Sequence, residues 1–357
     1  MKLLSIIIPA YNMEAYRAPC VESILRTPSL AAVEIIIVND GSKDKTLRIA
    51  KQYAERHRDT IRIVDKPNGN YGSTINAALP IAKGEFVKIL DADDTFNSSY
   101  LAEFLTFLGK MQGVDMIVTP FTEVNEQKEH RVDYNLYSRK VYEYGKIYDT
   151  EQIFGDGAIR FFMMHGVCYR TELLRQMGYR QSEGISYTDQ EWVFYPLFNV
   201  KSIAFANIPL YRYNTSREGQ TMDAKVQLRS LSQLIAVTEA IARYFATHSG
   251  AMESATRINF LRNIVADRIR VVYRKYLLVM PNTMFAASNF GEMDAQLTAL
   301  LAQCGIEELS VPVNNMLKVD LLARWRKKGR RYGVVRKLLL WADSSMSMVH
   351  TLLFRRK

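Results

Sequence analysis

Three carboxylates packed into four positions, Asp91, Asp93 and Asp94, are the residues of this chain best suited to chemistry. They directly follow Phe86–Leu90, an apolar run with the character of a buried strand. Open α/β sheets bind ligands outside the carboxyl ends of their strands, and neighbouring carboxylates repel one another unless a cation lies between them. Two interpretations are open from these residues alone: a divalent cation held together with phosphate oxygens, or an acidic turn that caps the next helix.

Polar residues also follow the first two predicted strands, Leu4–Ile8 and Glu34–Val38. Because parallel strands place their carboxyl ends at one edge of the sheet, Tyr11 and Asp40 are expected near the acidic cluster. Tyr11 either stacks on a base or packs in the protein. Asp40 either accepts from a base N–H or ribose hydroxyl, or caps the helix that begins at Thr46. No glycine-rich dinucleotide fingerprint or Walker loop follows the first strand, which excludes an ordinary NAD site and an ordinary ATPase.

The elements that would position these residues alternate between strand and helix over the first 120 residues. Continuous apolar strands separated by helices indicate a parallel sheet that is covered on both faces. We therefore predict an α/β fold with a Rossmann-like, mostly parallel sheet and helices on both faces. The predicted strands are Leu4–Ile8, Glu34–Val38, Ile61–Val64, Glu85–Leu90 and Asp115–Val118, and the predicted helices are Glu14–Arg26, Thr46–His57, Ser73–Ala82 and Ser99–Lys110.

The C-terminal part of the chain has a different, helical character. No apolar run approaches the roughly 18 residues that a spanning helix needs, so none is expected. The three widely spaced cysteines predict no disulfide framework, and a reducing cytosol is the simplest compartment. The predicted helices are Lys225–His248, Glu253–Met280 and Asp294–Gln303. The predicted domains are a catalytic domain at 1–222, a helical region at 223–317 and a basic amphipathic tail at 318–357.

Three motifs occur in a fixed order along the chain. They are Ser5–Asn12 (Ser-Ile-Ile-Ile-Pro-Ala-Tyr-Asn), Glu34–Thr46, which contains Val-Asn-Asp-Gly-Ser-Lys-Asp, and Gly84–Asp94, which ends in Leu-Asp-Ala-Asp-Asp. In this combination the chain resembles the family 2 glycosyltransferases, inverting enzymes with the glycosyltransferase A fold. The resemblance covers roughly residues 1–220. It implies metal-dependent transfer of one sugar from a nucleotide sugar to an acceptor hydroxyl.

The resemblance also implies roles for single residues. Asp91 and Asp93 match the family's Asp-x-Asp motif, so Asp93 would contact a Mn²⁺ or Mg²⁺ ion, and Asp91 the ribose or sugar together with the ion. One departure lies in Ser73–Asn76, where many relatives carry Arg-Asn and this chain has no arginine. The positions expected along the nucleotide sugar are Pro9, Tyr11, Asn12, Glu14, Asp40, Lys66, Asn68, Gly72, Asp91 and Arg217.

The acceptor hydroxyl needs a base on the face of the sugar opposite the leaving group. Asp189, within Ser186–Trp192, matches the family's acidic motif about 100 residues after Asp-x-Asp, and the resemblance implies that it is this base. Thr188 and Glu191 also have the spacing of a capping box, a structural role compatible with the catalytic one, and Glu191 is the reserve base. His165 either lines the acceptor site or is a packed, hydrogen-bonded residue.

The net charge of +10 resides in the C-terminal tail. Residues 318–357 contain 12 Lys and Arg but only two Asp, whereas the rest of the chain has equal numbers of basic and acidic residues. Basic residues interleaved with Leu, Trp and Phe are typical of a helix on an anionic membrane surface. A solvated helix face is the plainest alternative. No nucleic-acid partner is expected, because no nucleic-acid-binding motif accompanies the basic run.

These features together predict a hexosyl- or N-acetylhexosaminyltransferase. It would use a nucleotide sugar, preferably a UDP-sugar, and a glycan or lipid-linked acceptor in cell-surface polysaccharide synthesis, at the cytoplasmic face of the cell membrane. A sugar nucleotidyltransferase is the alternative enzyme, but it would carry a Gly-rich loop with Arg or Lys where this chain has Pro9–Glu14. A non-catalytic membrane scaffold is the alternative outside enzymes, and intact Asp91, Asp93 and Asp189 argue against it.

Overall fold

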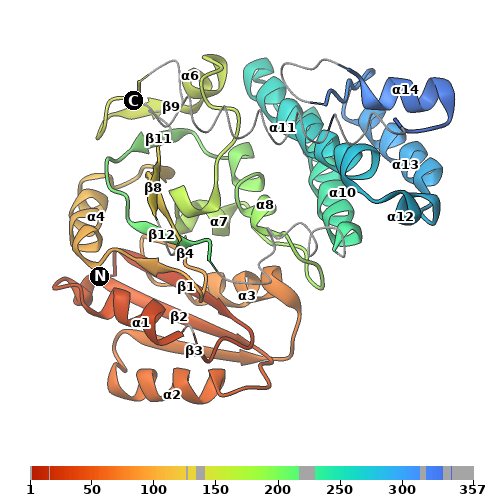
Figure 1. The fold of residues 1–357 in the computed structure, drawn as a ribbon. Helices are drawn as coiled ribbons and strands as arrows, with labels where there is room; N and C mark the ends of the chain where they lie inside the picture. The colour runs from red at the N-terminus through yellow and green to blue at the C-terminus, as the bar shows by residue number, and fades with distance from the viewer. Residues whose placement is uncertain are drawn as a thin grey trace. The chain divides into compact units, whose positions relative to one another are not determined.

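The computed structural model describes residues 2–15, 17–125, 128–133, 141–216, 230–313, 319–332 and 339. The chain divides into two units, Met1–Asp223 and Ala224–Lys357. The first unit is built around a large sheet, and the described part of the second unit is helical (Figure 1).

The large sheet has eight strands in the described part of the chain. In spatial order they are β3 (Ile61–Lys66), β2 (Val33–Asp40), β1 (Leu4–Ala10), β4 (Phe86–Ile89), β10 (Val167–Arg170), β6 (Met116–Val118), β11 (Ser202–Phe205) and β9 (Ile147–Asp149). The first four strands are parallel to one another, whereas β10 is antiparallel to both β4 and β6. The sheet is therefore mixed but mostly parallel, and the predicted α/β class is confirmed.

Helices cover the two faces of the parallel half of the sheet. Every residue of β1 is buried, and alternate residues of a strand point to opposite faces. Leu4, Ile6 and Ile8 share one core with three helices, whereas α3 (Asn70–Ala78) packs on β1 and β2 outside that core. The three helices of the shared core are α1 (Arg17–Leu25), α2 (Thr46–Arg56) and α4 (Ser98–Lys110).

A smaller sheet begins directly after the acidic cluster. Its strands, in spatial order, are β5 (Thr95–Phe96), β12 (Tyr211–Asn214), β7 (Phe121–Val124) and β8 (Glu129–Val132). Tyr211 lies opposite Phe96 in the antiparallel pair β5–β12. This pairing brings Tyr211 into contact with Asp94, which is 117 positions away in the sequence.

The first unit also contains short helices, and the described part of the second unit consists of helices of varied length. In the first unit these are α6 (Thr150–Gly155), the 3₁₀ helix Met164–Gly166, α7 (Thr171–Gln176), α8 (Asp189–Trp192) and the 3₁₀ helix Tyr195–Phe198. In the second unit they are α10 (Leu231–His248), α11 (Ala255–Arg274), α12 (Asn282–Ala286), α13 (Phe290–Gln303) and α14 (Leu321–Lys328). Within the described ranges, no helix combines the length and apolar character that crossing a membrane requires.

Some predicted boundaries are wrong for local reasons. The helix predicted over Glu14–Arg26 begins only at Arg17, because the backbone of Glu14 is tied to the next loop through the Asp44 carboxylate at 3.0 Å. The helix predicted over Glu253–Met280 is capped by the Ser254 side chain and changes into a π-helical turn, Lys275–Val279. The part of the predicted helix Lys225–His248 that precedes residue 230 lies outside the described residues.

Candidate active site

The loops after β1 and β2 are joined to each other. Asn12 has a φ of 51°, and its Oδ1 accepts from the Lys43 backbone N–H at 2.9 Å. Glu14 Oε2 accepts from the Lys45 backbone N–H, also at 2.9 Å. Asn12 and Glu14, predicted along the nucleotide, thus join the loops after β1 and β2 through these bonds. Tyr11, directly before Asn12, is 44% exposed, which leaves its ring accessible to a ligand.

Asp40 is the centre of a second polar group at the end of β2. Its Oδ1 accepts from Lys66 Nζ at 2.7 Å and from the Gly69 backbone N–H at 2.9 Å. Asn68 Nδ2 donates to the backbone oxygen of Asp40 at 3.0 Å. The structural alternative for Asp40, a cap for α2, is wrong, because the N-terminus of that helix bonds to Asp44 instead. The predicted residues Asp40, Lys66 and Asn68 are therefore in direct contact.

The carboxylates of the acidic cluster have different surroundings. Asp94 is buried, and it accepts from the Tyr211 hydroxyl at 2.6 Å and from the Asn214 backbone N–H at 2.7 Å. Burial and the neighbouring carboxylates of Asp91 and Asp93 raise the pKa of Asp94 to about 8. A cation beside these groups would act in the opposite direction, because it favours the ionised form. Asp94 thus anchors β12 to the acidic cluster.

His165 joins this cluster from a distant part of the sequence. Single ligand atoms of Asp91, Asp94 and His165 all lie within 4.8 Å of one another. His165 is 8% exposed, and its Nδ1 has no hydrogen-bond partner among the described residues. Two carboxylate oxygens and a neutral imidazole are a donor set that suits Mn²⁺. Asp93 does not belong to this group of described residues, so its contact with the ion stays a prediction.

The imidazole of His165 is held by aromatic rings and a buried lysine. Its ring stacks on Tyr213, with centroids 4.3 Å apart, and meets the edge of Tyr211 at 4.8 Å. Lys88 Nζ donates to the backbone oxygens of His165 at 2.7 Å and Val167 at 3.0 Å. Burial, together with Lys88, lowers the pKa of His165 to about 3, which keeps the imidazole in its neutral, ligating form. The ring is packed, as the structural alternative for His165 predicted, but its Nδ1 forms no hydrogen bond to any residue that the structure describes.

Asp189 is the first residue of α8 and is partly exposed. The predicted capping box is wrong, because Thr188 makes no side-chain cap and Glu191 faces elsewhere. Glu191 is fully buried and accepts from the Ser182 N–H at 2.7 Å, the Ser182 hydroxyl at 2.6 Å and the Tyr195 hydroxyl at 3.0 Å. With its oxygens occupied in this way, Glu191 fixes the position of α8 and is a poor reserve base.

Tyr71 interacts with both the acidic cluster and Asp189 of α8, and the sequence did not single it out. Its hydroxyl donates to Asp91 Oδ1 at 2.8 Å. Burial, then the charges of Asp91, Asp189 and Asp94, raise the pKa of Tyr71 well above its ordinary value. The strand-end carboxylates and the α8 carboxylate thus act on the same phenol. Tyr71 lies in the first turn of α3, between Asn70 and Gly72, and its role depends on a contact with a residue 20 positions away.

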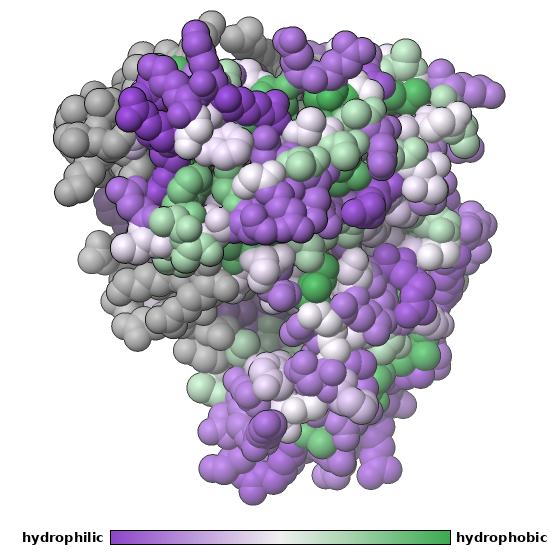
Figure 2. Space-filling view, turned by 90° about the vertical axis from the view of Figure 1, so that its right-hand side faces the viewer, coloured by the Kyte–Doolittle hydropathy of each residue, from purple (hydrophilic) through white to green (hydrophobic). Residues whose placement is uncertain are grey.

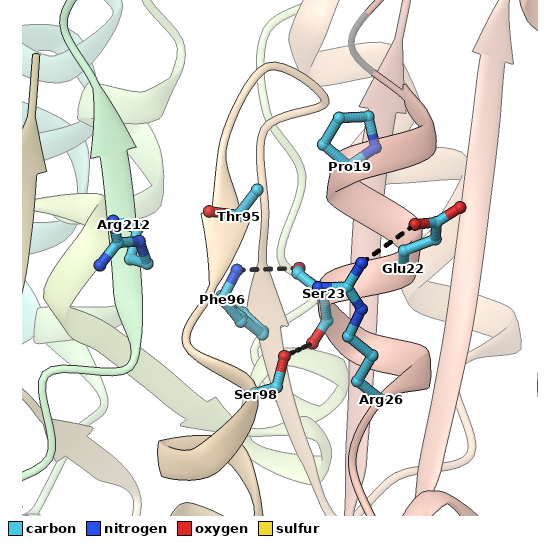
Figure 3. Close-up of a pocket in the computed structure, with 8 residues that line it drawn as sticks. All are labelled: Pro19, Glu22, Ser23, Arg26, Thr95, Phe96, Ser98 and Arg212. Atoms are coloured by element: carbon cyan, nitrogen blue, oxygen red, sulfur yellow. Dashed lines mark hydrogen bonds and ion pairs between the residues drawn. The ribbon is translucent and has the colours of Figure 1, made fainter. Parts of the chain in front are cut away.

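Arg217 lies outside the described residues. A surface hollow of about 330 Å³ between α1, β5 and β12 contains Arg26 and Arg212 but none of the predicted site residues (Figure 3). Arg26 is paired with Glu22 at 3.3 Å and Arg212 with Glu129 at 2.6 Å, so neither guanidinium lacks a counter-charge.

Comparison with known proteins gives a consistent result. The profile of the family described as Glycosyl transferase family 2 matches residues 5–178. The uncharacterized glycosyltransferase RP339 of Rickettsia prowazekii (strain Madrid E) is 30% identical over 238 residues, 65% of this chain and 70% of RP339. The uncharacterized glycosyltransferase EpsJ of Bacillus subtilis (strain 168) is 30% identical over 188 residues, 52% of this chain. The match spans only about half of EpsJ, 53% of its length.

Solved structures show the same fold at low sequence identity. Staphylococcus aureus TarS 1–349 in complex with UDP has a TM-score of 0.61 at 20% identity, with 93% of each chain covered. The mannosyltransferase PcManGT from Pyrobaculum calidifontis, in complex with GDP-Man and Mn²⁺, has a TM-score of 0.50 at 14% identity, with 85% of this chain and 83% of that chain covered. The first unit therefore has the glycosyltransferase A fold that its motifs predicted.

Proposed function

Because the chain belongs to the family 2 glycosyltransferases, we propose that it transfers a hexose or N-acetylhexosamine from a UDP-sugar to a hydroxyl of a glycan or lipid-linked acceptor. Cell-surface polysaccharide synthesis is the proposed setting. The observation that carries the proposal concerns the phenol of Tyr71. It hydrogen-bonds to Asp91, and the charge of Asp189 contributes to its raised pKa. This arrangement supports placing the predicted donor carboxylate and the predicted base in one site.

The nucleotide would lie along the loops after β1 and β2. The exposed ring of Tyr11 is available to stack on the base, beside Asn12 and Glu14. Pro9, also predicted along the nucleotide, is a buried residue of β1. Asp40, in contact with Lys66 and Asn68, offers a carboxylate to a base N–H or ribose hydroxyl. The UDP complex of TarS supports the choice of uridine, since the two proteins share a fold.

The acidic cluster would hold the divalent cation, Mn²⁺ or Mg²⁺, through Asp91 and Asp93, with Asp94 and His165 beside it. When bound, the cation stabilises the negative charge that develops on the departing diphosphate. Asp91 also orients the donor, and its hydrogen bond to Tyr71 restricts the orientation of its carboxylate. The Mn²⁺ complex of PcManGT supports a manganese-dependent reaction in this fold.

Asp189 would be the general base. Proton removal from the acceptor hydroxyl by Asp189 makes the oxygen nucleophilic as it attacks the anomeric carbon. Attack opposite the departing diphosphate inverts the anomeric configuration. Glu191 holds the helix that carries Asp189 through its three hydrogen bonds to Ser182 and Tyr195.

In the described part of the basic tail, only some side chains are available for the proposed membrane contact. Leu321 and Leu322 of α14 are buried, so the apolar face of this helix packs within the protein. Arg326 pairs with Asp294 at 2.8 Å. The face shown in Figure 2 is mostly hydrophilic, with hydrophobic residues scattered across it. We assign the contact with anionic lipid to exposed cations such as Lys327 and Lys328. We therefore expect phosphatidylglycerol vesicles to bind the wild-type protein better than the variant K327E/K328E.

A panel of nucleotide sugars with Mn²⁺, repeated with EDTA, tests the proposed reaction. We expect release of UDP, from one UDP-sugar above the others, that depends on both Mn²⁺ and an acceptor glycan. Formation of a nucleotide sugar from UTP and a sugar phosphate, with release of pyrophosphate, would instead identify a nucleotidyltransferase.

Flotation with phosphatidylglycerol vesicles tests the lipid contact. It compares the wild-type protein, K327E/K328E and the control R48E/K51E, whose charges lie on α2.

A further inference from the structure

The hydroxyl of Tyr71 is committed to a single carboxylate. It donates to Asp91 Oδ1 at 2.8 Å, and a phenol carries only one proton to donate. The Sδ atom of Met164 lies 3.7 Å from the same hydroxyl. A hydrogen bond to an ionised carboxylate is shorter and stronger than one between neutral groups. The phenol therefore restricts the orientation of the Asp91 side chain.

The backbone turn that carries Tyr71 is constrained on both sides. Asn70, directly before it, has a φ of 64°, in the left-handed region. Gly72, directly after it, approaches Ser182 so closely that a β-carbon would lie 2.1 Å from the Ser182 backbone oxygen. The phenol is therefore positioned by the fold before any ligand arrives, and its bond to Asp91 needs no additional ordering on binding.

We propose that Tyr71 is a positioning residue for binding of the nucleotide diphosphate and its cation, acting through Asp91. The hydrogen bond at Oδ1 holds the Asp91 carboxylate in the orientation that places one of its oxygens within 4.8 Å of ligand atoms of Asp94 and His165. This role rests on the proposed function, because it takes Asp91 as a ligand of the donor and cation. Tyr71 itself touches neither reacting atom.

Binding of Mn²⁺ and UDP to Tyr71→Phe tests the role directly. Phenylalanine keeps the ring and removes only the hydroxyl. We expect the affinity for UDP, measured calorimetrically with Mn²⁺ present, to fall roughly tenfold, with a parallel loss in Mn²⁺ binding followed by electron paramagnetic resonance. The matched control is Tyr142→Phe, because Tyr142 also donates to a carboxylate, at 2.7 Å from Asp156 Oδ2, outside the site. Both affinities should be unchanged in Tyr142→Phe.

A double-mutant cycle with Asp91→Asn separates positioning from general structural damage. If Tyr71 acts through the Asp91 carboxylate, adding Tyr71→Phe to Asp91→Asn should lower UDP affinity by no more than about twofold. Wild-type affinity in Tyr71→Phe, or an equal tenfold loss in both backgrounds, would overturn the role of Tyr71 while leaving the proposed function intact. Failure of the wild type to bind UDP with Mn²⁺ would overturn the proposed function and this inference together.

Discussion

Gly72 and Ser182 are in backbone contact, and a β-carbon on Gly72 would lie 2.1 Å from the Ser182 oxygen. Real β-carbon contacts essentially never fall below 3.0 Å. Ser182 also donates twice to Glu191, so this contact joins the first turn of α3 to α8. The first turn of α3, which contains the predicted donor-site residue Gly72, is therefore mechanically connected to the helix that carries Asp189.

Gly72→Ala should break this connection. The added methyl group collides with backbone rather than with a flexible side chain, so we expect a loss of stability of about 1–3 kcal/mol and weaker UDP binding. Thermal unfolding and calorimetry measure the two effects. Gly109→Ala in α4 is the control, because a β-carbon there meets nothing within 4 Å, and it should be neutral or slightly stabilising. Equal behaviour of the two variants would contradict the close contact.

Asp189→Asn should remove the general base while keeping the shape of the side chain. We expect the rate of sugar transfer to fall on the order of 10²- to 10⁴-fold, with UDP affinity nearly unchanged. Initial rates at saturating donor and calorimetric UDP titration check the two expectations. Asp59→Asn, at an exposed position, is the control. Near-wild-type transfer by the Asp189 variant would refute the assignment.

The buried carboxyl of Glu191 should make stability depend on pH. Burial raises the pKa of Glu191 above its ordinary value of 4.5. The folded protein holds the proton of the Glu191 carboxyl more tightly than the unfolded chain does. The stabilisation from this proton is therefore complete below pH 4.5 and is lost as pH rises through the pKa of the folded state. Glu191→Gln cannot titrate, so the stability advantage of wild type should be larger at pH 5 than at pH 7.5.

Urea unfolding of wild type and Glu191→Gln across this pH range measures the difference. Glu172→Gln, at an exposed position of α7, provides the control and should show a constant difference from wild type. If the stability advantage of wild type over Glu191→Gln instead grew with pH, the pKa of Glu191 would be lowered in the folded protein, and this prediction would be wrong.

Removal of divalent metal should stop transfer, and Mn²⁺ should restore it. We expect Asp91→Asn and Asp93→Asn each to weaken Mn²⁺ binding at least tenfold, since each removes a proposed carboxylate ligand. His165→Ala should also weaken Mn²⁺ binding, because the imidazole lies within 4.8 Å of the ligand atoms of Asp91 and Asp94. Electron paramagnetic resonance of free Mn²⁺ gives the affinities. Unchanged binding in Asp93→Asn would leave Asp91, Asp94 and His165 as the ion's ligands.

Local pattern was sufficient for most of the parallel half of the fold. The apolar run Glu34–Val38 predicted β2, and the helical spacing of Thr46–His57 predicted α2, because both signals depend on neighbours within a few residues. The order of the motifs likewise predicted the family. Boundaries were less accurate where side chains such as Asp44 bond across loops.

Contacts between distant segments could not be read in this way. Nothing near His165 in the sequence indicates that β10 inserts antiparallel between β4 and β6 and brings the imidazole to Asp94. The hydrogen bond of Tyr71 to Asp91 likewise depends on the packing of α3 beside the end of β4. Residue type and short-range periodicity specify which elements form and which side chains can do chemistry. Which side chains meet depends on strand order and packing, and these are set by the energy of the whole fold.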